Sequence, residues 1–435
     1  MRICFLLHNA YGIGGTIRST FNLAAALAER HEVEIVSALR HREVPTMGAP
    51  PGVRLTPLVD LRAAVPGSDG DDPRHGEPAE VFPRADGRHK QYSALTDARI
   101  GRYLSRLEAD VVVGTRPGLN VHIARQARPG IIRVGQEHLT LAGHGLRMRH
   151  EIRHRYRLLD ALTTVTDADA RTYRRIGPPG LRVEAVPNSV PAARADPCDG
   201  TARVIVAAGR LTPVKRYDVL LRAFAEVARA HPDWQLRIFG SGDHTGDEKE
   251  RLTALIRALG LTGSAHLMGN SDRLDAQWAQ GSVAVSTSDQ ESFGMTIVEA
   301  MRCGVPVVST DCPVGPREII EDRVDGRLVP PGDPGAVAAA LLDLVGDDRL
   351  RRRMGEAARR NAARFDPAGI AERHLGLYEE LLRRGPGRRS LGRAREAAHR
   401  SRTTVIDTAH TARALVKAAG PRFQGLGTGT PARRK

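Results

Sequence analysis

The chain has 435 residues, a formal net charge of +15, 41% hydrophobic residues and 4% aromatic residues. This length predicts two or three domains with substantial cores, and no apolar stretch approaches the roughly 20 residues that span a bilayer. The small aromatic content argues against a nucleic-acid-binding protein that stacks bases. The four cysteines have neither disulfide-framework nor metal-site spacing, which predicts reduced thiols and a cytoplasmic protein.

Strands and helices alternate from the first residues onward. Residues 2–7 form an apolar run that leads into a glycine-rich loop, which favours a buried strand over a signal peptide. Residues 63–90 are acidic and rich in Pro and Gly, and they predict a flexible surface insertion. The other strands expected in this half are 32–37, 53–58, 110–114, 131–135 and 161–165, with helices at 17–29, 91–107 and 147–159.

The alternation restarts after a linker at 191–200. Expected strands are 203–207, 235–239, 265–267, 283–286 and 305–309, with helices at 217–229, 247–259 and 295–301. Two such units predict an α/β protein with two doubly wound, Rossmann-like domains, 1–190 and 200–365, followed by a closing helix at 366–384. Ligands bind at the carboxyl ends of such strands, so the site is expected in the cleft between the domains.

The positive charge is concentrated in the last fifty residues. Fourteen Lys or Arg residues lie between Arg383 and Lys435 against two acidic ones, a net of +12, which leaves about +3 for the rest. Low aromatic content and many small residues predict a largely disordered tail over 385–435, with room for a helix at 394–419. Two interpretations stay open: attachment to an anionic membrane surface, and a solvated basic appendage.

The segment ESFGMTIVEAM, residues 291–301, predicts a helix that starts near Gly294 with Ser292 as its cap. The first turn of a helix offers free amides and a positive dipole end to an anion. Glu291 precedes the helix and Glu299 lies within it. A phosphate held by amides between two carboxylates suggests a nucleotide-sugar.

Two further loops follow predicted strands. In GRLTPVK (209–215), Arg210 and Lys215 are suited to neutralising a diphosphate, although such residues alone are usually plain surface residues. In GSGD (240–243), Gly240 permits close approach of a ligand to the backbone, although a simple turn explains it equally well. The loop GIGGTIRS (12–19) leads into a helix, and its glycines could bring backbone amides near a phosphate or a sugar.

His138 lies in the loop after the strand at 131–135, where an imidazole could contact a sugar hydroxyl, although a lone loop histidine is usually just exposed. Asp167 and Asp169 are spaced like a metal-binding pair, but a helix N-cap and first turn explain them better. No cluster has the spacing of a metal site, so none is predicted.

In chain order these segments resemble a retaining family 4 glycosyltransferase of the GT-B fold, also called glycosyltransferase group 1. The matching stretches are GIGGTIRS, the loop with His138, VPNSV, GRLTPVK, GSGD, ESFGMTIVEA, CGVPVVSTDCPVGPREII and DGRLVPPGD. Each motif is weak alone, whereas the ordered set is highly specific. The resemblance covers residues 1–382, and the insertion at 63–90 and the tail lie outside it.

The resemblance implies a role for each matching residue. Arg210 and Lys215 would bind the donor diphosphate, Glu299 the ribose, and Glu291 the hydroxyls of the transferred sugar. His138 would lie near the anomeric centre, although here its acidic neighbour precedes it instead of following it. The residues implied in donor binding beside these are Gly15, Arg18, Gly240, Gly294, Met295 and Thr296.

The implied reaction transfers a sugar, with retention, from a nucleotide-diphospho-sugar. A UDP-sugar is favoured, no metal or other cofactor is required, and the departing phosphate helps to deprotonate the acceptor on the same face. The acceptor is expected to be a lipid-linked or polymeric cell-envelope glycan, with the enzyme cytoplasmic or peripheral on the inner face of the membrane. The alternatives are a GT-B-fold sugar-nucleotide epimerase or phosphorylase, and a non-enzymatic polyanion-binding protein. The donor sugar, its base and the acceptor stay open.

Overall fold

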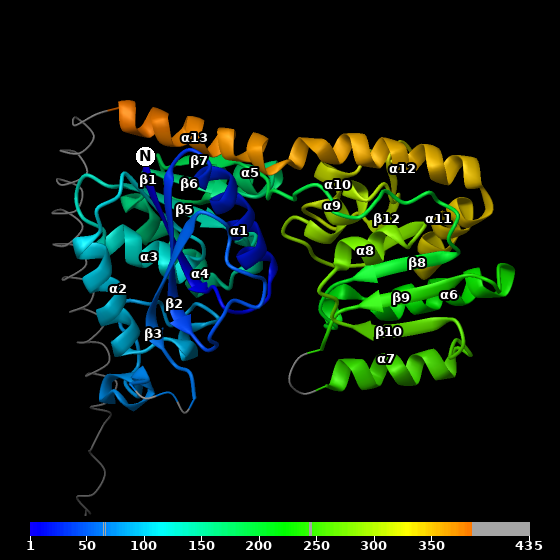
Figure 1. Cartoon of the computed structure of the whole chain (residues 1–435), viewed down its shortest axis with the longest axis horizontal. Helices are drawn as coiled ribbons and strands as arrows, with labels where there is room; N and C mark the ends of the chain where they lie inside the picture. Colours follow the sequence, from blue (N-terminus) through cyan, green and yellow to red (C-terminus); the bar gives the residue numbers. More distant parts are fainter. Residues whose placement is uncertain (64, 66, 243–245, 385–435) are drawn as a thin grey trace, which may run out of the picture. The chain divides into compact units, whose positions relative to one another are not determined.

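The computed structural model describes residues 1–63, 65, 67–242 and 246–384, which form a chain of alternating strands and helices (Figure 1). Residues 1–383 make one compact unit, and the predicted tail lies outside the described residues. Within this unit we call the part built on β1–β7 the N-domain and the part built on β8–β13 the C-domain. No helix in the described part of the chain has the length and apolar character needed to cross a membrane.

The N-domain holds a seven-stranded parallel sheet in the order β3-β2-β1-β4-β5-β6-β7. Its strands are β1 (Arg2–Asn9), β2 (Glu32–Arg40), β3 (Val53–Asp60), β4 (Val111–Gly114), β5 (Ile132–Glu137), β6 (Ala161–Thr164) and β7 (Arg182–Ala185). Its helices are α1 (Gly15–Ala28), α2 (Ala94–Arg106), α3 (Pro117–Gln126), α4 (Leu146–Arg155) and α5 (Asp167–Ile176). Strand β1 is apolar from Ile3 to Leu7 because both of its faces are covered there: Cys4 and Leu6 join one core cluster, and Ile3 and Phe5 the other.

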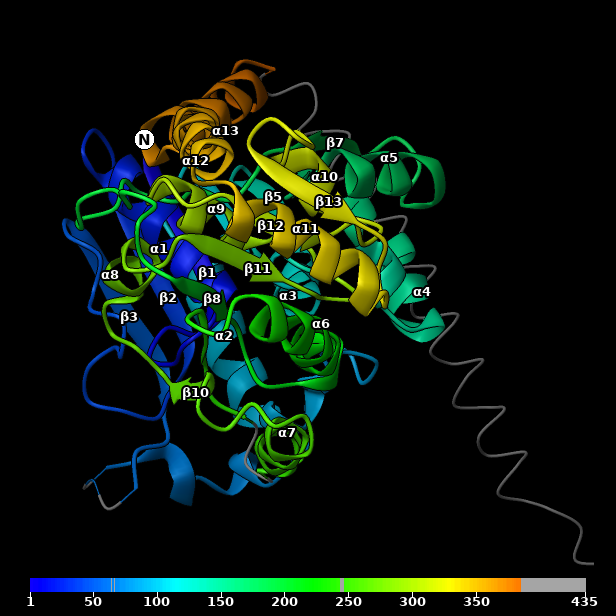
Figure 2. The ribbon, with the colours of Figure 1, turned by 90° about the vertical axis from the view of Figure 1, so that its right-hand side faces the viewer.

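The C-domain holds a six-stranded parallel sheet in the order β10-β9-β8-β11-β12-β13. Its strands are β8 (Val204–Ala208), β9 (Gln235–Phe239), β10 (Ala265–Gly269), β11 (Val283–Ser286), β12 (Val307–Thr310) and β13 (Gly326–Val329). Its helices are α6 (Tyr217–Ala230), α7 (Asp247–Ala258), α8 (Leu274–Ala279), α9 (Met295–Arg302), α10 (Pro316–Ile319), α11 (Pro334–Gly346) and α12 (Asp348–Ala362). In Figure 2, α6 and α11 lie in front of the strands, and α9 packs with α8 and α12. The two parallel sheets confirm the predicted α/β, GT-B-like architecture.

The last described helix, α13 (Pro367–Arg383), belongs by its packing to the N-domain. Its buried residues Leu375, Tyr378 and Leu381 lie in the same core cluster as Phe5 and Phe21. Figure 1 shows α13 in orange beside β7 and α1. The chain therefore returns to its first domain after completing the second, and the closing helix expected at 366–384 is present.

The segment 63–90, predicted to be a flexible surface insertion, contains short turns and makes contacts with α2. Its described residues include three short 3-10 turns, Asp69–Asp71, Pro73–His75 and His89–Gln91. The Asp97 carboxylate of α2 accepts hydrogen bonds from the backbone N–H groups of Glu80 at 2.7 Å and Val81 at 2.6 Å. The second half of the insertion is thus bonded to α2, because the Asp97 carboxylate accepts from two of its backbone N–H groups.

Each sheet has a switch point, by which we mean the pair of neighbouring strands where the strand order reverses. In the N-domain this pair is β1 and β4, and in the C-domain it is β8 and β11. Loops that leave the carboxyl ends of such a pair run to opposite faces of the sheet, which makes this position the usual ligand site of doubly wound folds.

Candidate active site

The loops that follow β8 and β11 bring two predicted site residues together at the C-domain switch point. Lys215 ends the 3-10 turn Pro213–Lys215 after β8, and Glu291 follows β11. Lys215 Nζ lies 2.6 Å from Glu291 Oε1, and the Ser288 hydroxyl donates to the same oxygen at 2.8 Å. Both side chains of the pair are largely buried, at 20% and 12% exposure, so the ion pair is poorly screened by water. Ser288 was not predicted from the sequence.

Backbone hydrogen bonds hold these two loops against each other. The Thr287 hydroxyl lies 3.0 Å from the carbonyl oxygens of both Lys215 and Arg216, and the Asp289 N–H donates to the Val214 carbonyl at 2.9 Å. Arg216 adopts a left-handed backbone conformation with φ of 49° and contacts the Asp289 carboxylate at 3.0 Å. The cation and the carboxylate of the site therefore sit on a preorganised frame.

The glycine at the end of β9, Gly240, leaves no room for a side chain. Gly240 has φ of 139°, and a Cβ atom there would lie 1.9 Å from the carbonyl oxygen of Gly209. The Gly240 N–H donates to the Gly269 carbonyl at 2.7 Å. Gly240 thus lets the ends of β8 and β9 approach closely, which is a structural need whether or not a ligand touches it. Arg210, which follows β8, is exposed, and its side chain makes no hydrogen bond or ion pair with the described residues.

Helix α9 begins at Met295, and its N-cap is Gly294 with φ of 112°. The prediction that Ser292 caps this helix is wrong, because no side chain of the N-cap residue bonds the first turn and the glycine alone makes the turn. A helix leaves the N–H groups of its first turn without intrahelical partners. The amides at Met295 and Thr296 are therefore suited to an anion, as predicted for the donor phosphate.

Glu299 lies on α9 and is paired with a residue from the other domain. Arg18 of α1 donates from its guanidinium to Glu299 Oε1 at 2.8 Å, and the two side chains are 38% and 11% exposed. Burial raises the pKa of the Glu299 carboxyl above its ordinary range, and the Arg18 charge opposes that shift. Gly15 is the first residue of α1, so the glycine loop positions the helix that carries Arg18.

His138 directly follows β5 and is buried, with 9% exposure. Its Nδ1 lies 3.5 Å from the Ser19 hydroxyl of α1. Burial lowers the pKa of His138 to about 4, and nearby Asn188 opposes the shift. The imidazole is therefore neutral at physiological pH, able to accept or donate a hydrogen bond but not to supply a positive charge.

The structure also revises the predicted role of the aspartates at the start of α5. The N-cap is Thr166 and not Asp167, since the Thr166 hydroxyl accepts from the Asp169 N–H at 3.4 Å. The Glu318 carboxylate, from α10 of the C-domain, accepts from the N–H groups of Asp167 at 2.7 Å and Ala168 at 2.8 Å. Glu318 lies in the matching stretch CGVPVVSTDCPVGPREII, but nothing in the sequence indicated this interdomain contact. In the part of the chain that the structure describes, no group of three or more His, Cys, Asp or Glu residues is arranged for a metal ion.

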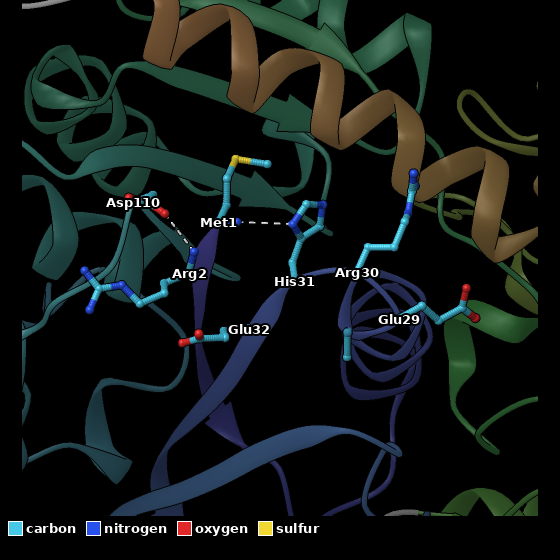
Figure 3. Close-up of a pocket in the computed structure, with 8 residues that line it drawn as sticks. Met1, Arg2, Glu29, Arg30, His31, Glu32 and Asp110 are labelled. Carbon is cyan, nitrogen blue, oxygen red and sulfur yellow. Dashed lines mark hydrogen bonds between the residues drawn. The ribbon is translucent and has the colours of Figure 1, made fainter.

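A polar hollow lies away from these residues, at the amino-terminal ends of β1 and β2 (Figure 3). In it the Met1 amino group lies 3.2 Å from His31 Nδ1, and the Arg2 N–H donates to Asp110 at 2.7 Å. Ligands of parallel sheets bind at the opposite, carboxyl ends of the strands. The hollow therefore plays no part in the candidate site.

Comparisons with known proteins agree with this fold. A family model for glycosyl transferases group 1 matches residues 193–361, and a model for glycosyltransferase family 4 matches residues 13–194. The chain belongs to glycosyltransferase family 4. The two matches meet between the domains, and together they span residues 13–361.

Relatives of this family 4 member differ in what their names describe. An exopolysaccharide phosphotransferase of Streptomyces coelicolor is 34% identical over 417 residues, covering 92% of this chain and 43% of that protein. A D-inositol 3-phosphate glycosyltransferase of Corynebacterium kroppenstedtii is 35% identical over 190 residues, 42% of each chain. The matched region is thus less than half the length of these curated relatives.

A solved structure has the same fold. A point mutant of TarM from S. aureus, in complex with fondaparinux, α-GlcNAc-glycerol and UDP, superposes with a TM-score of 0.70 at 16% identity. The superposition covers 87% of this chain and 99% of that one. At this identity the likeness establishes the GT-B fold alone.

Proposed function

We propose that this protein transfers a sugar, with retention of anomeric configuration, from a UDP-sugar to a glycan acceptor. The observation that carries the proposal is the pair of carboxylates Glu291 and Glu299, held on either side of the α9 start by Lys215 and Arg18. A ligand with sugar hydroxyls at both ends and a diphosphate between them would match that order of groups. UDP in the complex of the structurally similar TarM supports this choice of nucleotide.

The donor would replace the internal partners of the site. Lys215 and exposed Arg210 would turn to the diphosphate, together with the amides at the start of α9. Glu299 would accept hydrogen bonds from the ribose, and Glu291 from the transferred sugar. These cations and dipoles would stabilise the leaving diphosphate as its charge develops.

Retention would follow from attack on the face that the diphosphate leaves. The acceptor hydroxyl would pass its proton to a departing phosphate oxygen while its own oxygen bonds to the anomeric carbon. His138, neutral because it is buried, would hydrogen-bond the donor sugar near that carbon. No carboxylate nucleophile is assigned in this scheme.

The acceptor is proposed to be a cell-envelope glycan, polymeric or lipid-linked. The names of two relatives, which refer to exopolysaccharide and to an inositol phosphate, support this class of acceptor. Attachment to the inner face of the membrane through the tail belongs to the same proposal, although the tail lies outside the described residues. Reduced co-sedimentation with anionic liposomes after deletion of 385–435 tests that attachment.

Calorimetric titration with UDP tests the donor site. Lys215→Ala should weaken UDP binding by roughly tenfold or more, since a charge-assisted hydrogen bond contributes about 1.5–3 kcal/mol. Lys249→Ala is the matched control because Lys249 is exposed on α7, and it should leave the affinity within about twofold. If the wild-type protein neither binds UDP nor releases sugar from UDP-, GDP- or ADP-sugars, the proposed function is wrong.

The same assays address the proposed independence from metals. Arg210, Lys215 and the amides at the start of α9 would stabilise the negative charge of the diphosphate, which a metal ion stabilises in other enzymes. Turnover that is unchanged by a chelator supports this part of the proposal. Turnover that is lost and then restored by a divalent cation rejects it without touching the choice of donor.

A further inference from the structure

The N-domain switch point carries a second group of polar side chains that the donor site does not use. Strand β1 ends in His8 and Asn9, and β4 is followed by Arg116. This position corresponds to the one that holds Lys215 and Glu291 in the C-domain. Because ligands of doubly wound sheets bind where the strand order reverses, the N-domain should have a ligand position of its own here.

The end of the insertion and the residues that directly follow it lie against this switch point. His8 Nδ1 lies 2.9 Å from the Tyr92 hydroxyl, and His8 Nε2 lies 2.8 Å from Gln91 Oε1. Since Gln91 Oε1 can only accept, Nε2 carries the proton and the Tyr92 hydroxyl donates to Nδ1. Burial and the charges of Arg116 and Arg88 lower the pKa of His8 to about 3, so this neutral tautomer persists. His8 therefore fixes Gln91 and Tyr92, the two residues that follow the insertion, in place.

A packed aromatic pair and an ion pair anchor the rest of this segment. Phe82 is fully buried and stacks on Tyr92, with ring centroids 3.5 Å apart. The Asp86 carboxylate is bonded by the Arg116 guanidinium and by the N–H groups of Gly118 at 3.1 Å and Arg88 at 2.9 Å. The one carboxylate between residues 81 and 93 is thus already satisfied.

Positive charge remains on this segment after these contacts are counted. Arg84, Arg88 and Lys90 are exposed, and none of their side chains has a hydrogen-bond or ion-pair partner among the described residues. Gln91 is also exposed, and its oxygen is engaged by His8, which leaves its amide nitrogen to donate elsewhere. Exposed cations that could bind an anion, and an amide that could donate to a hydroxyl, therefore lie close together near the end of β1.

We propose that residues 84–91, with His8 as a positioning residue, form an acceptor subsite for an anionic glycan that carries phosphate or carboxylate groups. Arg88 and Lys90 would contact the anionic groups, and the Gln91 amide a sugar hydroxyl. The inference rests on the proposed function, because it names the substrate class that would meet the donor sugar from the N-domain side. It assigns a role to the insertion that the family resemblance leaves without one.

Hydrogen–deuterium exchange of the full chain locates the subsite, since it separates this segment from the basic tail. The probes are a glycerol-phosphate oligomer, an oligogalacturonate and a neutral dextran oligomer of matched length. Either anionic oligomer should slow exchange in peptides covering 84–93 and 115–118, and dextran should not. Protection that is equal with dextran, that is confined to 385–435, or that appears only on the basic helix α4 would overturn the proposal.

A charge-matched pair of variants tests the assigned residues. The double variant Arg88→Gln, Lys90→Gln should need a roughly fivefold to tenfold higher concentration of anionic oligomer to reach the same protection. The salt dependence of that protection should also become smaller. The control Arg349→Gln, Arg353→Gln removes two exposed cations from α12 and should shift it by less than about twofold. Equal shifts in the two double variants would mean that only net charge matters, and the subsite would be rejected.

UDP titration of the wild-type protein separates this inference from the proposed function. Normal UDP binding without protection at 84–93 defeats the subsite alone. Absence of UDP binding defeats the donor assignment, whatever the oligomers do.

Discussion

The two switch points of this protein share a topology but are built from different chemistry. In the C-domain, β8 and β11 present the buried ion pair of Lys215 and Glu291, and the glycines beside it permit close backbone contacts. In the N-domain, β1 presents the neutral His8, bonded at both nitrogens, and the segment 84–91 beside it carries exposed cations. The first arrangement pairs a cation with a carboxylate, and a diphosphate could replace the carboxylate. In the second, the exposed cations are Arg84, Arg88 and Lys90, and the one carboxylate between residues 81 and 93, Asp86, is already bonded.

This difference follows from what surrounds each pair of strands. The loops after β8 and β11 bond each other directly through Thr287 and Asp289, so the C-domain site is assembled from short segments close in sequence to their strands. The end of β1 is instead covered by an insertion that lies far along the chain from that strand. A site that depends on a segment outside the sheet can change its ligand without disturbing the sheet.

Glu291→Ala should produce the largest effect on turnover. Loss of the carboxylate proposed to hold the sugar should lower the rate of sugar transfer or donor hydrolysis by roughly 100-fold or more, while UDP affinity changes little. Donor-sugar release and UDP calorimetry measure the two effects. The exposed Glu250 of α7 provides the control substitution, Glu250→Ala, which should leave both unchanged. Equal losses of turnover and UDP affinity would contradict the separate roles of Glu291 and Glu299.

Gly240→Ala should cost stability, because its Cβ atom would collide with the Gly209 carbonyl at a left-handed backbone position. We expect a loss of about 2–4 kcal/mol in the free energy of unfolding, measured in urea. Gly263→Ala, in open space, is the control within the C-domain. Gly15→Ala also meets no neighbour within 4 Å, so any loss of UDP affinity there without loss of stability would point to a ligand contact. A stable Gly240→Ala protein would show that the loops of β8 and β9 can move apart.

The fold was predictable because both sheets are built from continuous apolar strands that alternate with amphipathic helices. Helix α3 was missed, since its sequence PGLNVHIARQ begins like a turn and is buried on all sides, which removes the usual amphipathic pattern. The strand at 305–309 was placed correctly within two residues, as β12 at Val307–Thr310. Element boundaries depend on caps, and those at Ser292 and Asp167 were misassigned because Gly294 and Thr166 serve instead.

The candidate site was predictable only as a set of residues and not as a set of contacts. Motif order named Lys215, Glu291, Arg18 and Glu299, but their pairing across the fold requires coordinates. The contact of Glu318 with α5 and the bond of His8 to Gln91 join residues that are far apart in the sequence. No local pattern encodes such contacts, because they depend on which loops the two sheets bring together.

His8→Gln should make the protein less sensitive to acid. The folded pKa of His8 is lowered to about 3 against 6.5 unfolded, so its neutral form contributes stability that is present above pH 6.5 and lost as the pH falls toward 3. Between pH 7.5 and pH 5 we expect His8 to account for a loss of about 1–2 kcal/mol in the free energy of unfolding, allowing for its partial exposure. Urea unfolding of both proteins at the two pH values measures it. Parallel losses would mean that other groups, such as His138, carry the acid sensitivity.

Arg18→Gln should have the smallest effect and the most specific one. Arg18 opposes the burial that raises the pKa of Glu299, so its removal should raise that pKa further. The ribose would bond to the ionised carboxylate, so UDP affinity should fall as the pH is lowered and Glu299 is protonated. In the variant this fall should begin at a higher pH than in the wild type, with a loss of affinity of about fivefold near neutral pH. UDP calorimetry across pH 5 to 8 measures the shift.

Arg30→Gln is the control, because Arg30 follows α1 and pairs with an exposed glutamate, Glu372, that touches no site residue. If Arg18→Gln and wild-type profiles differ only by a constant factor, Arg18 acts on the donor phosphate and not through Glu299. If they coincide, the interdomain pair belongs to the ligand-free protein alone, and the C-domain switch point binds the nucleotide without help from the N-domain. The pH at which UDP affinity falls therefore decides whether the N-domain contributes to nucleotide binding through Arg18 or contacts only the transferred sugar.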